Sequence, residues 1–398
     1  MHPVTTQAQA MSVARPAEPE GAFQSGQNLA IAAGHFVHDT FTAFLPPLLP
    51  LMSERLSLSL TLAGSLATIL QLPAVLNPFI GYMADRVSLR YFVVLAPAVT
   101  ATLMSSLGFA PSYPVLVVIL LVTGVSVAAF HAPAPAMIGR TSGNQVGKGM
   151  SWFMAGGELG RTIGPLLVAW AVTTWTMDGY FRVMALGWAT SLLLLWRLRS
   201  IPAHTVRRPG LRTMLPVARR LFPPLLGIVV TRSLLMAALS VYLPTYMTLQ
   251  GAPLWIASAS LATWEVAGVG GALVSGPLSD RLGRKPLLLF AFVSSSALML
   301  VFLNTSGWLL VPVLLGLGFT ALSPAPVMLA LVQEHLPEHR AVANGLYISM
   351  GFLIRSVIIL VIGAIGDAFG LRTAFLWSAL ASLLAALPVL WLPKPPKN

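Results

Sequence analysis

The sequence has no cysteine and very little charge. Only 9% of its 398 residues are Asp, Glu, Lys or Arg, whereas about 25% is usual in soluble domains. The absence of cysteine excludes disulfides, thiolate metal sites and catalysis by a thiol. Low charge, 56% hydrophobic residues and a mean hydropathy of +0.80 together exclude a soluble globular protein. The chain is therefore expected to lie in a membrane.

Long apolar runs predict helices rather than a barrel. A transmembrane barrel would show alternating segments of about 10 residues, but the runs here are about 18 to 25 residues long and rich in Leu, Ala, Gly and Val. We therefore predict an all-α membrane protein with twelve transmembrane helices in two six-helix bundles. The predicted spans are residues 28–52, 60–83, 92–109, 114–138, 148–173, 179–197, 222–249, 254–278, 286–304, 308–333, 341–366 and 372–392.

The positive charges indicate the domain order and the topology. Of the 24 Lys and Arg residues, 18 fall in the N-terminal tail and in alternate loops. This positive-inside pattern places both termini and the central loop in the cytoplasm, so the basicity does not indicate a nucleic-acid partner. The predicted units are a disordered cytoplasmic tail (1–27), an N-terminal bundle (28–197), a basic cytoplasmic linker (198–221), a C-terminal bundle (222–392) and a cytoplasmic tail (393–398).

The two predicted bundles repeat each other. A Gly-x-x-x-Asp-Arg sequence at residues 81–86 recurs 195 positions later, at residues 276–281. Gly156 and Arg161 are matched at nearly the same offset by Gly351 and Arg355. Duplicated halves predict a substrate site near mid-membrane between them, opened alternately to each side by rocking. The candidate gating-loop residues are Gly81, Asp85, Arg86 and Arg90 in the first copy and Gly276, Asp280, Arg281, Gly283, Arg284 and Lys285 in the second.

These features resemble the major facilitator superfamily over essentially the whole chain after residue 27. The loop signature Gly-x-x-x-Asp-Arg-x-Gly-Arg-Lys is complete at residues 276–285, whereas the first copy has Ser88 and Leu89 in place of its second Gly and first basic residue. Gly160, Gly164 and Pro165 resemble the Gly-x-x-x-Gly-Pro signature of the superfamily's antiporters. The same glycine spacing is common where helices pack closely. The resemblance implies secondary transport by alternating access.

A narrower resemblance is to the fosmidomycin resistance proteins, which are bacterial inner-membrane efflux carriers. It implies export of a small molecule across the inner membrane. One position departs from that family, because Ala132-Pro133 stands where the family has Pro-Glu, and this chain lacks a carboxylate there. The residues that carry the resemblance are Gly34-His35-Phe-Val-His38-Asp39, Leu45-Pro-Pro-Leu-Leu-Pro50, Phe130-His131 and Gly156-Gly157-x-x-Gly160-x-x-x-Gly164-Pro165.

Ionisable side chains inside the predicted spans are few, and each is a functional candidate because an unpaired charge in a bilayer is costly. His35 and Asp39 are four residues apart and share one helix face. An acid in a low-dielectric cavity beside a base can take up and release a proton. Asp39 is the favoured proton carrier, and a permanent ion pair is the structural alternative. The candidate proton-coupling residues are Asp39, Glu158, Glu265, His35 and His38.

Buried arginines favour an anionic substrate. Arg161 and Arg355 are pseudo-equivalent, and two guanidinium groups facing one cavity would bind an anion well; alternatively, Arg161 neutralises Glu158. Pro133 and Pro135 are expected to break the helix beside His131. For the polar and aromatic candidates, interhelical hydrogen bonding and core packing are the alternatives. The candidate substrate-binding residues are Arg161, Arg232, Arg355, His131, Gln71, Asn77, Trp152, Trp264 and Tyr347.

The sequence thus predicts a secondary active transporter, most simply a proton-coupled exporter of a small anionic or amphiphilic compound such as a fosmidomycin-like drug. Uptake or facilitated transport of an organic anion or metabolite is the alternative. A membrane-embedded metal enzyme or sensor using three of the histidines and Asp39 is a remote alternative. Gradients must drive uphill transport, because no phosphate-binding loop is present. We expect no catalysis, cofactor or metal, and a monomer that interacts with substrate, protons and membrane lipids.

Overall fold

The computed structural model describes residues 23–77, 79–80, 90–142, 146–199, 215–336 and 340–393. These ranges are almost entirely helical and contain no strand. The first half holds α1 (Ser25–Thr42), α2 (Leu45–Leu56), α3 (Leu60–Gln71), η1 (Leu72–Leu76), α5 (Arg90–Ser105), η2 (Leu107–Phe109), α6 (Tyr113–His131), α7 (Ala134–Thr141), α8 (Val146–Gly179), η3 (Tyr180–Val183) and α9 (Met184–Arg197). The second half holds α10 (Leu215–Leu249), α11 (Leu254–Leu282), α12 (Arg284–Phe302), η5 (Gly307–Leu309), α13 (Leu310–Leu322), α14 (Pro324–His335), α15 (Arg340–Phe369), α16 (Leu371–Leu384) and α17 (Ala386–Leu390).

Nine helices of the described chain are long and apolar enough to cross a membrane. One of these, Trp152–Arg197, contains two passes, because it is interrupted at Thr176, whose φ and ψ are 63° and 174°. Leu60–Leu76 is a shorter apolar helix, and α1 with α2 forms a further pass that is broken after Thr42. The described residues therefore contain twelve helical passes, which confirms the predicted fold class.

Prolines interrupt several passes. The helix α6 ends at His131 and α7 begins at Ala134, so the break predicted from Pro133 and Pro135 is confirmed. The same interruption recurs in the second half, where α13 ends and α14 begins at Pro324. Proline lacks the amide hydrogen that would bond the carbonyl four residues earlier, so each break leaves main-chain groups free inside a pass.

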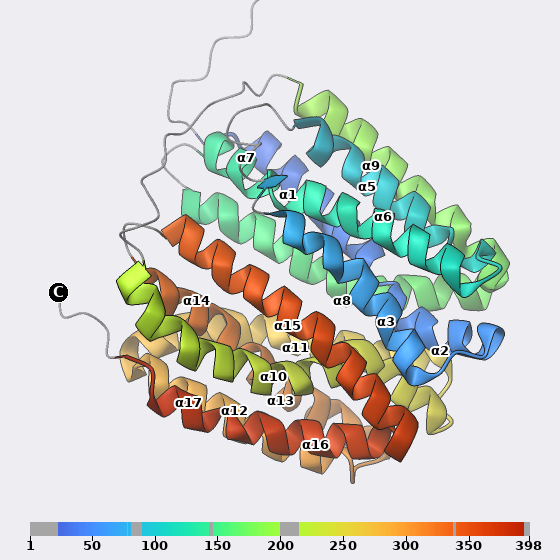
Figure 1. Cartoon of the computed structure of the whole chain (residues 1–398). Helices are drawn as coiled ribbons and strands as arrows, with labels where there is room; N and C mark the ends of the chain where they lie inside the picture. The colour runs from blue at the N-terminus through green and yellow to red at the C-terminus, as the bar shows by residue number, and fades with distance from the viewer. Residues whose placement is uncertain are drawn as a thin grey trace, which may run out of the picture.

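The two halves lie side by side, and four helices make most of the contact between them, with a smaller contact between α2 and α10. In Figure 1 the blue-to-green helices of the first half occupy the upper part, and the yellow-to-red helices of the second half occupy the lower part. Across the junction α3 packs against α15, and α8 packs against α11. Side chains on these four helices can therefore meet between the halves.

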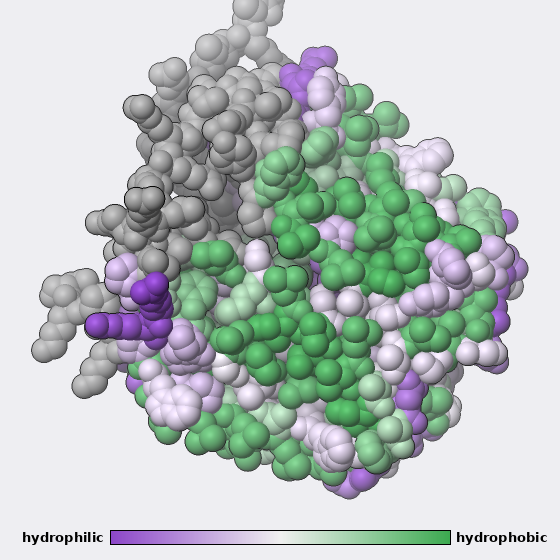
Figure 2. Space-filling model, in the orientation of Figure 1, coloured by the Kyte–Doolittle hydropathy of each residue, from purple (hydrophilic) through white to green (hydrophobic). Residues whose placement is uncertain are grey.

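The outer surface is apolar, as a lipid-facing surface should be. Large side chains such as Trp170, Leu192 and Phe290 are more than half exposed. Figure 2 shows broad hydrophobic areas over the visible face, with hydrophilic residues gathered towards its margins. An exposed apolar surface of this extent is compatible with a lipid environment and not with water.

The folded chain starts earlier than the sequence predicts. The sequence predicts a disordered tail over residues 1–27, but α1 begins at Ser25. The cause is Asn28, which is fully buried and donates hydrogen bonds to the carbonyl oxygens of Gln24 and Thr141 at 3.0 and 2.8 Å. These bonds tie the start of α1 to α7. Residues 1–22 of the predicted tail lie outside the described residues.

The predicted linker of residues 198–221 is also too long. Helix α10 begins at Leu215, so the last part of this segment is helical. Leu221, Leu225 and Ile228 recur every three to four residues and are fully buried in one hydrophobic cluster. Burial of residues at a helical spacing stabilises the start of α10. The basic side chains between these residues make the same stretch look like a polar linker in the sequence.

One end of the junction between the halves is tied by Asp367, near the end of α15. Its carboxylate accepts hydrogen bonds from the main-chain amides of Leu60 and Thr61 at 2.6 and 2.8 Å, and from the Thr61 hydroxyl at 2.5 Å. A side chain of the second half therefore caps the N-terminus of α3 in the first half. In Figure 1 this end of α15 lies on the right, beside α3.

Candidate functional site

Glycines bring α1 and α8 into close contact. A Cβ atom at Gly160 would collide with the carbonyl oxygen of Phe36, and one at Gly164 would collide with that of Thr40. A Cβ at Gly157 would lie 2.6 Å from Nε2 of His35. Pro165 follows inside α8 and leaves the carbonyl of the residue four positions earlier without its helical partner. The close approach allows side chains of α1 to reach those of α8 and α6.

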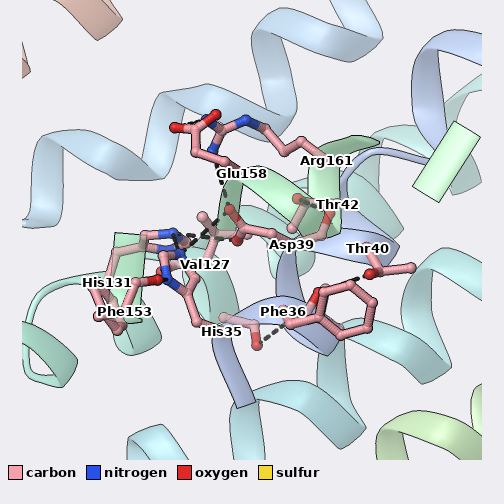
Figure 3. Close-up of polar contacts among 12 residues, drawn as sticks. His35, Phe36, Asp39, Thr40, Thr42, Val127, His131, Phe153, Glu158 and Arg161 are labelled. Carbon is pink, nitrogen blue, oxygen red and sulfur yellow. Dashed lines mark hydrogen bonds and ion pairs between the residues drawn. The ribbon is translucent and has the colours of Figure 1, made fainter. Parts of the chain in front are cut away.

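Asp39 is the centre of a buried polar cluster, shown in Figure 3. Its side chain is 4% exposed. Its Oδ2 lies 3.4 Å from Nε2 of His35 and 3.2 Å from Nη1 of Arg161. Its Oδ1 lies 3.3 Å from Nε2 of His131. The residues come from α1, α6 and α8, so the cluster forms only when these three helices are packed.

Arg161 joins this cluster to a second acid. Its Nη2 makes an ion pair with Oε1 of Glu158, one turn earlier on α8. The Arg161 side chain is 36% exposed and that of Glu158 is 23% exposed. A guanidinium group that bridges two carboxylates neutralises half of their combined charge. The pairing of Arg161 with Glu158, given above as an alternative, is present.

Three ligand atoms of the cluster are close enough together to raise the question of a metal ion. His35, Asp39 and His131 offer atoms that lie within 4.8 Å of one another. Nη1 of Arg161, however, already places a positive charge on the same carboxylate. This charge repels a divalent cation and competes for its oxygen ligand. We therefore assign no metal to the cluster.

The second half carries two arginines of a different kind. Nη2 of Arg232 donates to the carbonyl oxygen of Ala321 at 3.2 Å, and Nη2 of Arg355 donates to the hydroxyl of Ser240 at 2.8 Å. The Nε atoms of both arginines are buried without a hydrogen-bond partner in the described chain. No described carboxylate lies within 4 Å of either arginine. These two guanidinium groups retain donors and positive charge.

Glu265 lies on α11, which packs against α8 across the junction of the halves. Arg161 and Arg355 both act on it electrostatically. No ion pair or hydrogen bond of its carboxylate occurs within the described ranges. Both predicted anion-binding arginines, Arg161 and Arg355, thus have a carboxylate nearby. Only Arg161 makes ion pairs in the described chain, with Asp39 and Glu158.

Three other polar candidates lie apart from this cluster's hydrogen bonds. His38 is fully buried, its ring stacks on Phe130 at 4.5 Å, and neither nitrogen has a partner in the described part of the chain. Gln71 donates to the carbonyl of Ala67 at 3.3 Å, within its own helix. The carbonyl oxygens of the Gln71 and Asn77 side chains are buried and unbonded within the described residues. The structure does not join these residues to Asp39.

The predicted aromatic lining divides into three different surroundings. Trp264 is fully buried in the large core cluster, and its Nε1 has no hydrogen-bond partner among the described residues; its contact with a ligand stays a prediction. Trp152 is half-buried and packs edge-on against Phe23 at 5.3 Å. Tyr347 is half-buried, and its hydroxyl lies 3.6 Å from Sδ of Met328. The positive charge of Arg232 interacts electrostatically with this hydroxyl.

The candidate gating loops are only partly described. In the first loop, the candidates Gly81, Asp85 and Arg86 lie outside the described residues. In the second loop, Gly276 and the exposed Arg281 lie in the last turns of α11, and the Asp280 side chain is outside the described part.

The described loop contacts stay within one half. Arg90 donates to the carbonyl oxygen of Leu198 at 3.4 Å. Gly283, with φ of 89°, separates α11 from α12. Arg284 pairs with Glu334 of α14 at 2.5 Å, and Lys285 donates to a carbonyl oxygen near the end of α17 at 3.0 Å. These contacts hold the second loop against its own half.

Sequence reasoning did not find Ser240 or Asp367. Ser240 is one of many small residues in α10, and only its 2.8 Å hydrogen bond with Arg355 distinguishes it. Asp367 could have been recognised in the sequence as an acid close to the end of a predicted span. Its partners, the amides at the start of α3, are about 306 residues away in the chain.

Known proteins similar to this chain are membrane transporters. The family model described as Major Facilitator Superfamily matches residues 31–359 and 259–398. The chain is 24% identical to the fosmidomycin resistance protein of Escherichia coli (strain K12) over 376 residues, which are 90% of this chain and 91% of that protein.

Solved structures show the same architecture. A bacterial homologue of the human lysosomal transporter Spinster, inward-facing and unoccupied, matches 96% of this chain and all of its own with a TM-score of 0.76 and 12% identity. A D-xylose-proton symporter matches 94% of this chain and 99% of its own with a TM-score of 0.75 and 17% identity. At these identities the structural likeness concerns the fold.

Proposed function

Since the chain belongs to the major facilitator superfamily, we propose that it is a proton-coupled antiporter that exports a small anionic compound. The superfamily's members are membrane transporters and not enzymes, so the finer questions are the coupling ion, the direction and the substrate. The proposal takes its coupling site from the cluster around Asp39 and its substrate contacts from the second half.

The observation that carries the proposal is the unequal distribution of charge between the halves. Asp39 and Glu158 are matched by Arg161 and two histidine rings, which suits the binding and release of a proton. Arg232 and Arg355 have only neutral hydrogen-bond partners in the described chain. A buried guanidinium with free donors is costly unless an anion or water completes its contacts, so these arginines favour an anionic substrate.

The distant relative supports efflux of a drug-like anion as the direction and substrate class. That protein is named for resistance to fosmidomycin, and export is the simplest way in which a membrane carrier confers resistance. We place the protein in a bacterial inner membrane, as a monomer among lipids, with both termini in the cytoplasm as the basic loops favour.

A pH-jump experiment in proteoliposomes tests the proposal. The wild-type protein and Asp39→Asn are compared with a panel of phosphonates, organic anions and cationic drugs. We expect a pH gradient to drive accumulation of an anionic compound, and Asp39→Asn to abolish driven accumulation while exchange continues. Accumulation of cationic compounds alone would contradict the anionic assignment of Arg232 and Arg355.

Inverted vesicles test the direction. Substrate-induced release of protons from the vesicle lumen is the expected result for antiport. Substrate movement that is indifferent to the gradient would instead favour facilitated transport of an organic anion, and substrate movement together with protons would favour uptake. Either of these two results would contradict the proposed antiport.

A further inference from the structure

The ring nitrogens of His35 and His131 have defined hydrogen-bonding roles. Nδ1 of His35 lies 2.7 Å from the carbonyl oxygen of Phe153, and Nδ1 of His131 lies 3.0 Å from that of Val127. A carbonyl oxygen can only accept a hydrogen bond, so each Nδ1 carries a hydrogen and donates it. In a neutral imidazole the other nitrogen is then an acceptor. Both Nε2 atoms therefore present lone pairs when the rings are neutral.

The two Nε2 atoms face each other at 3.2 Å (Figure 3). They lie 3.4 and 3.3 Å from the two carboxylate oxygens of Asp39. One of these oxygens, Oδ1, is buried and accepts no hydrogen bond within the described chain. Several lone pairs converge on one small volume, which is unfavourable unless a proton lies among them. One added proton makes one ring an imidazolium, whose Nε2 donates to the Nε2 of the other ring.

The same proton balances the charge of the cluster. Asp39 and Glu158 carry two negative charges, and Arg161 carries one positive charge. With both histidines neutral, the cluster keeps one negative charge in excess. A single imidazolium removes this excess, and a neutral cluster is favoured in a low-dielectric interior.

The groups around the pair favour one added proton over two. Arg161 of α8 lies beside Asp39 and opposes a further positive charge, while Glu158 of α8 already pairs with Arg161. His38 of α1 is fully buried with its ring on Phe130. Glu265 of α11 acts on the cluster from the other half. A second imidazolium would place two positive rings at hydrogen-bond distance from each other, and the single negative charge of Asp39, which Arg161 also contacts, would not balance both.

We propose that the transported proton lies between Nε2 of His35 and Nε2 of His131, and that Asp39 is its counter-ion. This assignment rests on the proposed proton coupling and replaces Asp39 as the carrier. The His131 side chain is 32% exposed and that of His35 is 5% exposed, so the proton arrives from water at His131. Arrival forms one N–H bond and breaks none within the protein, and release leaves two neutral rings.

Nitrogen NMR of ¹⁵N-histidine-labelled protein tests the assignment without transport. The full chain has seven histidines, so single variants assign the signals. The variants His35→Asn and His131→Asn each keep an amide donor near the position of Nδ1 and remove Nε2. In the wild type near neutral pH we expect the Nε2 nitrogens of His35 and His131 to give two signals that are coupled to each other through one shared proton. Either variant should abolish both signals.

His335 supplies a matched control. Its Nδ1 lies 2.8 Å from the carbonyl oxygen of Leu331, four residues earlier, just as His131 contacts Val127. His335→Asn should leave the shared-proton signals unchanged. If either asparagine variant does not fold, His131→Gln offers a second test, because its amide can occupy the Nε2 position but cannot titrate. That variant should also lose the shared-proton signals.

Transport measured on the same variants separates the two proposals. We expect pH-driven accumulation to fall by about tenfold or more in His35→Asn and His131→Asn, with exchange retained. Shared-proton signals without any pH-driven transport in the wild type would contradict antiport and make the proton structural. Driven transport with both Nε2 atoms unprotonated down to about pH 5 would overturn the histidine assignment, as would zinc bound stoichiometrically at these residues.

Discussion

The polar centres of the two halves contain the pseudo-equivalent Arg161 and Arg355 but differ in the partners of these arginines. In the first half, Arg161 meets two carboxylates, and Asp39 also meets two histidines. In the second half, the pseudo-equivalent Arg355 meets a serine hydroxyl, and Arg232 meets a main-chain carbonyl. The arginine of the first half makes ion pairs with acids of its own half, whereas the two arginines of the second half have only neutral hydrogen-bond partners and keep unbonded donors in the described chain.

This difference separates two tasks that a coupled carrier must perform. A group that binds a proton needs acids and bases in balance, so that one proton changes the net charge. A group that binds an anion needs donors that the protein leaves unfilled. The two halves share pseudo-equivalent positions such as Arg161 and Arg355, but the residues around these positions differ.

The largest expected effect comes from removing the acid of the first centre. Asp39→Asn removes the counter-ion of Arg161 and of the histidine pair, and breaking a buried ion pair costs about 3–5 kcal/mol. We expect loss of pH-driven transport and a markedly lower thermal unfolding temperature, measured in detergent with and without lipid. The matched control is Asp178→Asn, whose pair with Arg55 is exposed and contributes at most about 1 kcal/mol. Equal effects of the two substitutions would contradict the comparison.

The second centre is tested by changing its donors but not its charge. Arg355→Lys keeps a positive charge and loses the planar set of donors, which should weaken anion binding about 10- to 100-fold. The response of the remaining transport to pH should persist, because the first centre is intact. Substrate protection against thermal unfolding and the KM for exchange measure the change. Arg372→Lys is the control, since Arg372 also donates only to neutral oxygens, those of Leu303 and Asn304, but lies at the start of α16.

A pair of pseudo-equivalent glycines tests whether the first centre depends on closer packing. A Cβ at Gly156 would collide with the carbonyl oxygen of Ala32, whereas a Cβ at Gly351 meets nothing within 4 Å. We expect Gly156→Ala to destabilise the protein by about 1–3 kcal/mol. Gly351→Ala should be neutral or stabilise it by about 0.5–1 kcal/mol, because alanine favours a helix interior. Thermal unfolding of the two variants side by side decides the point.

The smallest expected effect concerns the contact that joins the halves. Asp367→Asn weakens three hydrogen bonds to the start of α3, which should shift the equilibrium towards opening at that end by about tenfold or less. The cysteine-free chain allows a clean readout. Thr68→Cys lies buried beside Ser356 across the junction, and its thiol labelling should accelerate in the Asp367→Asn background. An unchanged rate would show that Asp367 does not hold the halves together.

Much of the fold can be predicted from the sequence because a membrane span is recognised by the composition of one continuous segment. Runs of apolar residues bounded by Pro, Gly and charge gave the passes, and Pro133 gave the break after His131. The misplaced boundaries are those at Ser25 and Leu215. In both places burial against distant residues extends a helix through polar or basic sequence, and a local pattern does not record such burial.

The candidate site was predicted as a set of residues and not as a set of contacts. His35, Asp39 and Glu158 could be named because ionisable groups in a span are rare. The sequence could not show that Trp264 is fully packed, because aromatic residues in spans serve cores and pockets alike. Nor could it show that His38, next to Asp39 in the chain, is turned towards Phe130.

By itself, the sequence determined a twelve-pass helical membrane protein of two repeated halves, because hydropathy, charge bias and internal repeats are properties of the chain. Only the tertiary structure decided which charges neutralise one another. Arg161 reaches Asp39 across 122 residues, and Asp367 reaches Leu60 across 307. Such partners are chosen by the packing of helices against each other, and in a low-dielectric interior that choice decides whether a charge is neutralised or left for a ligand.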